Sequence, residues 1–141
     1  MLRLALAVSV ATAPNPKPCS GSDTISINAC ADAEFKRTDA VLNRYYQAAQ
    51  HRLQEEKQTK TAALLVQSQR SWIAYRDAEC DAVYQNWIDG TIRGSMAIGC
   101  KINLTQIRTY AIWRNWLTYM DSTPPILPRP DIKSATQDDA Q

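Results

Sequence analysis

Apolar side chains recur every three or four residues along three long stretches of the chain, which is the spacing of an amphipathic α-helix. The first stretch begins near Ser22-Asp23-Thr24, which offers good helix N-cap side chains, and ends at a polar corner around residues 55–58. The second runs from about Thr59 to Ile88, and the third from about Ser95 to Tyr119. The pattern predicts an all-α fold, a small antiparallel bundle of three main helices spanning residues 22–120.

The two ends of the chain lack this periodicity. Residues 1–13 carry Arg3, an apolar run and then small residues, which predicts a secretory signal peptide too short to span a bilayer. The alternative is an ordinary disordered N-terminus, or a start inside a longer signal. Residues 14–21 are punctuated by Pro and Gly and predict a linker. Residues 121–141 contain four prolines between Pro124 and Pro130 and then a polar end, which predicts a disordered tail.

The chain carries Cys19, Cys30, Cys80 and Cys100, an even number that predicts two disulfides in an exported protein. No pair has the C-x-x-C spacing of a zinc site, so the alternative is four reduced, buried thiols. In an antiparallel bundle, Cys30, Cys80 and Cys100 fall at about the same level, with Cys19 on the arm at that end. Of the three connectivities, we favour Cys30–Cys100 with Cys19–Cys80.

The second stretch contains an unusual run, QRSWIAYRDAEC, from Gln69 to Cys80. It combines aromatic rings, an adjacent Arg and Asp and a thiol, where a plain core seam would use Leu, Ile and Ala. In one interpretation, Arg76 and Asp77 form a semi-buried ion-pair network, Arg76 with Asp39 and Asp77 with Arg108. In the other, both line a cleft for a partner. We favour the first, because such a pair more often fixes helix register than binds.

This run resembles the signature of the LprI-type lysozyme-inhibitor N-terminal domain, a family of small bacterial envelope proteins. The matching residues are Gln69-Arg70-x-Trp72-x-x-Tyr75-Arg76-Asp77-x-x-Cys80, flanked by Cys19, Cys30, Asp39-x-x-Leu42-Asn43-x-x-Tyr46, Cys100 and Thr105-x-x-Arg108. The resemblance covers roughly residues 19–112, and its separated pieces keep the family order. It implies a periplasmic or secreted protein that binds lysozyme, with Tyr46, Trp72, Tyr75, Arg76, Asp77 and Arg108 as candidate partner-binding residues.

Aromatic side chains divide into two groups. Tyr46, Trp72, Tyr75 and Trp87 stand at helical spacing, which is more typical of a core than of a recognition surface. On the third helix, Tyr110, Trp113, Trp116 and Tyr119 nearly encircle the axis. Either some of these rings, with Trp113 and Trp116 as candidates, are exposed for a partner, or residues 121–132 fold back over them through Ile126 and Leu127, and the sequence favours neither alternative.

Catalysis has little support in the sequence. The single histidine, His51, lies on a polar helix face without an orienting partner, and there is no nucleophile elbow, phosphate loop or histidine pair. We expect no enzyme activity, no cofactor and no metal. With 16 basic against 14 acidic residues, the net charge of +2 argues against a nucleic-acid partner.

Two functions remain for a disulfide-tied helical bundle of this kind. The first is a secreted or periplasmic binding protein that inhibits lysozyme. The second is a structural or stress-related envelope domain that binds another protein. A net charge near zero gives no long-range attraction toward a basic lysozyme, so the first function requires a local acidic surface.

Overall fold

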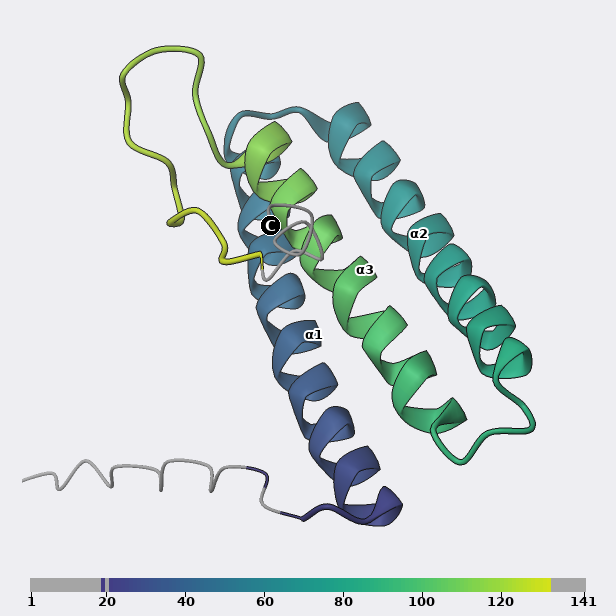
Figure 1. Ribbon diagram of the computed structural model, residues 1–141. Helices are drawn as coiled ribbons and strands as arrows, with labels where there is room; N and C mark the ends of the chain where they lie inside the picture. The colour runs from purple at the N-terminus through teal and green to yellow at the C-terminus, as the bar shows by residue number, and fades with distance from the viewer. Residues whose placement is uncertain (1–18, 20, 133–141) are drawn as a thin grey trace, which may run out of the picture.

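The computed structural model describes Cys19 and residues 21–132, and its helices lie side by side in one bundle (Figure 1). Helix α1 spans Thr24–Glu55, α2 spans Thr59–Asn86 and α3 spans Arg93–Trp116. No described residue is in a strand, so the predicted all-α bundle is confirmed. The predicted signal peptide, residues 14–18 and 20 of the predicted linker, and residues 133–141 lie outside the described residues.

Helix α1 begins where its capping chemistry predicts. The Asp23 carboxylate accepts hydrogen bonds from the Ser26 amide at 3.0 Å and from the Ser26 hydroxyl at 2.6 Å. These two bonds lower the pKa of the Asp23 carboxyl from its ordinary value. The ionised carboxylate thus satisfies a backbone donor that would otherwise lack a partner in the first helical turn.

The polar corner after α1 is a Schellman turn built on a lysine. Lys57 has a φ of 57°, in the left-handed region where glycine is the usual residue. The Lys57 amide donates to the Gln54 carbonyl at 3.0 Å, and the Gln58 amide donates to the Leu53 carbonyl at 2.8 Å. These bonds close the last turn of α1 and reverse the chain into α2.

The core lies in the half of the bundle nearest this turn. Its buried members come from all three helices and the residue after α3; they are Leu42, Tyr45, Ala49, Leu53, Leu65, Ile112 and Leu117. Helix α3 contacts both other helices extensively, whereas α1 and α2 contact each other less. Helices α1 and α2 are instead joined through the side chain of Arg76, which reaches Phe35 and Asp39 on α1.

The disulfides pair sequence neighbours, Cys19 with Cys30 and Cys80 with Cys100. Two disulfides were predicted correctly, but the favoured connectivity, Cys30–Cys100 with Cys19–Cys80, is wrong. Cys80 and Cys100 are each ten residues from Gly90, so the α2–α3 hairpin brings them level, with their Cα atoms 5.6 Å apart. Cys19 instead closes a short loop onto the first turns of α1.

Residues 121–132 differ from the predicted disordered tail, because they run back along the bundle (Figure 1). The Tyr45 hydroxyl donates to the Pro128 carbonyl at 2.7 Å, and the Trp113 indole donates to the Leu127 carbonyl at 2.9 Å. Leu127 also packs against the core. Trp113 and Trp116 are both half-buried against the core rather than exposed, and the bond from Trp113 to this segment confirms the fold-back alternative for that ring.

Two of the aromatic residues expected in the core are at the surface. The exposed fraction is 53% for Tyr75 and 39% for Trp87. Trp72 and Tyr46 are half-buried and pack against the core, as predicted. The outward position of Tyr75 becomes important for the partner surface below.

Candidate functional site

Arg76 is the centre of the signature network, which we define as Asp39, Trp72, Arg76, Asp77 and Arg108. It is only 8% exposed. Its Nη1 donates to Asp39 Oδ1 on α1 at 3.1 Å, and its Nε donates to Asp77 Oδ1 at 3.0 Å. The predicted contact between Arg76 and Asp39 is confirmed, and it joins the middle of α2 to α1.

Aromatic rings enclose the same guanidinium group. Arg76 Cζ lies 5.2 Å from the Phe35 ring centroid and 5.1 Å from the Trp72 centroid. Both distances fall within the range of a cation–π interaction. Phe35 and Asp39 belong to α1, and Trp72 and Asp77 belong to α2. Each of the two helices therefore contributes one ring and one carboxylate to the surroundings of Arg76.

Arg108 does not make its predicted contact with Asp77. Its Nε donates to Gln69 Oε1 at 3.0 Å and its Nη2 donates to Ser68 Oγ at 3.0 Å, so it joins α3 to α2 through neutral partners. Asp77 is paired with Arg76 instead, and Lys101 Nζ lies 3.9 Å from it. Burial lowers the pKa of Arg108, while nearby Tyr46 acts in the opposite direction. Within the described part of the chain, no carboxylate lies within 4.0 Å of Arg108.

Two members of this arrangement were missed from the sequence as site residues, Gln69 and Phe35. Gln69 is 6% exposed and stands seven residues before Arg76, on the same face of α2. Phe35 stands four residues before Asp39 on α1, which places it beside that carboxylate. Counting helical turns back from Arg76 and from Asp39 would have identified Gln69 and Phe35 as neighbours of the network.

The signature also has an outward half. Tyr75 is 53% exposed, although it lies between the half-buried Trp72 and the buried Arg76 along the chain. Glu79 is exposed one turn after Tyr75, on the same face of α2. The network therefore fixes the helices on one side, while α2 offers an aromatic ring and a carboxylate on the other.

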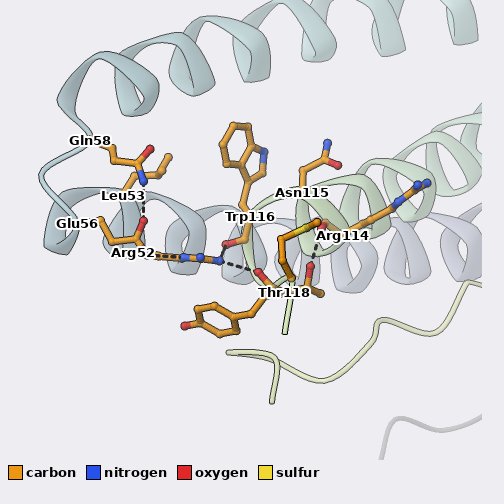
Figure 2. Close-up of a pocket in the computed structure, with 10 residues that line it drawn as sticks. Arg52, Leu53, Glu56, Gln58, Arg114, Asn115, Trp116 and Thr118 are labelled. Atoms are coloured by element: carbon orange, nitrogen blue, oxygen red, sulfur yellow. Dashed lines mark hydrogen bonds and ion pairs between the residues drawn. The ribbon is translucent and has the colours of Figure 1, made fainter. Parts of the chain in front are cut away.

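A cavity of about 280 Å³ lies at the opposite end of the bundle, around Arg52 (Figure 2). Arg52 Nη1 donates to the Trp116 carbonyl at 2.8 Å and to the Thr118 carbonyl at 2.9 Å, after the end of α3. Its Nε is 2.8 Å from Glu56 Oε1, and this contact lowers the pKa of the Glu56 carboxyl. Arg52 thus satisfies helix-terminal carbonyls and closes the bundle, a structural role that the sequence pattern did not indicate.

His51 lies at the surface, as predicted, with its side chain 71% exposed and its Nδ1 3.4 Å from Glu55. Among the described residues, no three His, Cys, Asp or Glu side chains gather as a metal site would require. None of the described helices is both long enough and apolar enough to cross a membrane.

Comparison with known proteins places most of the chain in one family. The model of the family described as lysozyme inhibitor LprI matches residues 17–112, which include the four cysteines and the whole signature network. An uncharacterized protein of Rhizobium meliloti (strain 1021) is 32% identical over 94 residues, which cover 60% of this chain and 68% of that protein. No solved structure matches the chain. Residues 121–132, which run back over the bundle, lie beyond the family match.

Proposed function

The chain belongs to the LprI family of lysozyme inhibitors, and from this premise we propose that it is an exported, non-enzymatic protein that binds lysozyme and blocks lysis. The family membership supplies the partner. The single structural observation that supports a binding role is the outward position of Tyr75 beside a rigid ion-pair network.

Tyrosine is a frequent hot-spot residue, because it contributes a large contact area at a low cost in side-chain entropy. In the signature, packing accounts for Trp72, Arg76 and Gln69, but it does not account for Tyr75. The ring stands on a helix that is tied to α1 by Arg76 and to α3 by a disulfide. A contact residue held in this way loses little freedom when a partner binds.

The charge of this face also supports a basic partner. Glu79 is exposed one turn after Tyr75 and Asp81 is exposed further along α2, and neither forms an ion pair with another described residue. They supply the local acidic surface that the near-neutral net charge left in question. Such a surface would attract a basic lysozyme and orient it toward α2.

Export is supported by the cysteines. All four are in disulfides, and disulfides persist in the periplasm or outside the cell, where thiols are not kept reduced. The proposed location is therefore periplasmic or secreted. We expect the protein to act stoichiometrically rather than by turnover, because its single histidine, His51, is exposed and pairs only with the exposed Glu55.

The test is a lysis assay with the oxidised protein and lysozymes of several classes. We expect the lysis rate of at least one class to fall with the molar ratio of inhibitor and to reach its minimum near equimolarity. Tyr75→Ala should weaken inhibition about tenfold, the effect of a moderate hot-spot residue. Ile73→Ala is the matched control, since Ile73 is 41% exposed on the same helix but outside the signature contacts.

Unchanged lysis rates for every class would contradict the inhibitor function, and the second function, an envelope domain with another protein partner, would replace it. Inhibition that persists after reduction and unfolding would contradict both, because each requires the folded bundle. If the Tyr75→Ala variant still inhibited lysozyme fully, the lysozyme contact would lie on another face of the protein.

A further inference from the structure

A second concave surface lies away from Tyr75, between α1, α3 and the C-terminal segment. It is a groove of about 400 Å³, and we call it the arginine groove after three of its lining residues, Arg37, Arg44 and Arg129. Val41 lies between the two arginines of α1 and Tyr45 follows the second, while Glu34 and Asp131 are the acidic residues of the lining. One of its walls comes from residues 129–131, beyond the family match, so the groove is a feature of this chain in addition to the family signature.

The arginines of the groove are unequally neutralised. Arg37 donates to Glu34 Oε2 from both Nε and Nη2, at 3.1 and 2.6 Å. Arg44 and Arg129, in contrast, have no carboxylate within 4.0 Å in the described part of the chain. Two guanidinium groups therefore line the same groove without a carboxylate partner among the described residues, and guanidinium groups bind carboxylates through paired hydrogen bonds.

Arg129 is held in place by its neighbours. The preceding carbonyl, that of Pro128, accepts the Tyr45 hydroxyl at 2.7 Å, and the following residue, Pro130, is buried. The Arg129 guanidinium lies over the Tyr110 ring, with Cζ 5.3 Å from the centroid. Two prolines with fixed φ angles and a stacked side chain position this cation before any ligand arrives.

The length of the groove indicates the form of its ligand. Arg37 and Arg44 are seven residues apart on α1, or about 10 Å along the helix axis. Val41, which is 45% exposed, gives the groove an apolar stretch between them. An extended peptide advances about 3.3 Å per residue, so a ligand that contacts Arg44 and reaches past Val41 toward Arg37 needs three or four residues.

We propose that the arginine groove binds an extended acidic segment of a partner protein, with carboxylates on Arg44 and Arg129 and an apolar side chain on Val41. This contact uses a different face from Tyr75 and does not depend on lysozyme inhibition.

The test is calorimetric titration of the full-length oxidised protein with the peptide acetyl-Glu-Gly-Val-Gly-Glu-amide, whose Glu and Val side chains share one face when it is extended, and with its Gln-for-Glu counterpart. We expect binding of the Glu peptide alone, weakening as salt is added, because the groove arginines are open to solvent. Arg44→Gln and Arg129→Gln should each weaken binding about fivefold or more. Arg70→Gln is the matched control, because Arg70 is exposed on α2, outside the groove.

Equal binding of the two peptides would overturn the proposal, and so would an equal loss in the Arg70→Gln variant, which would indicate non-specific attraction. Succinate that binds as tightly as the Glu peptide would assign the groove to small carboxylates instead. Far-UV circular dichroism of each variant shows whether the helices are intact, so that a loss of binding can be distinguished from a loss of folding.

Discussion

Replacing Arg76 by alanine tests whether the signature holds the bundle together. The substitution removes one hydrogen bond to Asp39, at 3.1 Å, and one to Asp77, at 3.0 Å, and it removes the cation from between two rings. It also leaves a space where the buried aliphatic stem of Arg76 packed, because the residue is only 8% exposed.

The expected loss of unfolding free energy depends on how exposed the carboxylates of Asp39 and Asp77 are. Removing one partner of a fully buried ion pair costs about 3–5 kcal/mol, mainly because the other charge is left without water. Here the Asp39 and Asp77 side chains are 40% and 46% exposed, so both carboxylates regain water and the charge contribution is at the low end. The two cation–π contacts add about 0.5–1 kcal/mol each, and the lost stem packing adds about 1 kcal/mol. We expect Arg76→Ala to lower the free energy of unfolding by about 2–4 kcal/mol.

The assay is urea unfolding followed by tryptophan fluorescence and by far-UV circular dichroism. Arg76→Lys keeps the charge but loses the planar group, so it should recover only part of the stability. Arg70→Ala is the control for loss of an exposed arginine on the same helix. If the midpoint of Arg76→Ala equals that of the wild type while inhibition is lost, the structural role is refuted and Arg76 is a partner-binding residue.

Three further changes test other parts of the fold. Replacing Cys80 and Cys100 together by serine should cost about 3 kcal/mol of unfolding free energy, from the closed loop of 20 residues, as measured by urea unfolding; an unchanged midpoint would contradict this. Trp113→Phe removes the hydrogen bond to the Leu127 carbonyl, so amide hydrogen exchange after α3 should accelerate; exchange as slow as in the wild type would refute this anchor. The lowered pKa of Asp23 means that its cap stabilises the native state above the unfolded-state pKa, and this stabilisation is lost as the pH falls through the folded-state pKa. Asp23→Ala should therefore lower the melting temperature near neutral pH but not in strong acid, and an equal effect at both would exclude the carboxylate as its source.

The helices and part of the network were predictable because helical periodicity fixes which side chains share a face. The spacing placed Arg76 on the inner side of α2 and Asp39 on α1, and the structure joins them. The pairing of Asp77 with Arg108 failed for a geometric reason. Asp77 is adjacent to Arg76, whose Nε reaches it directly, and this local contact replaced the long-range one.

Composition alone predicted a disordered C-terminal tail, and only the apolar pair Ile126 and Leu127 supported the alternative in which this segment folds back. Proline-rich, polar sequences resemble disordered tails, but prolines also restrict the chain before it folds and so reduce the entropy lost when it docks. Two side-chain donors on the bundle, Tyr45 and Trp113, point to successive carbonyls of this segment, at Pro128 and Leu127. Those donors lie far from the segment in sequence, and no local pattern reveals the match.

The disulfide connectivity was another feature that helical periodicity could not predict. Helical periodicity placed Cys30, Cys80 and Cys100 at about the same level of the bundle, so any two of them could pair. The arm that carries Cys19 has no helical period, so the sequence did not show which cysteine it reaches. Its partner was decided by chain length, since an arm that enters α1 directly reaches Cys30 before it reaches any other helix.

This division between inner and outer residues bears on what the family signature can specify. Arg76, Trp72 and Gln69 face inward and make contacts that any protein with these three helices would need. They preserve the fold whatever partner is bound, so a change of partner should leave them untouched. Partner choice would then rest with outward positions that the signature leaves open, such as Glu79 beside Tyr75, and with additions beyond the signature such as the arginine groove. Exchanging Glu79 for the residue of a relative with a different lysozyme preference should shift that preference without changing the urea midpoint. A shifted midpoint with unchanged preference would place specificity in the inner network instead.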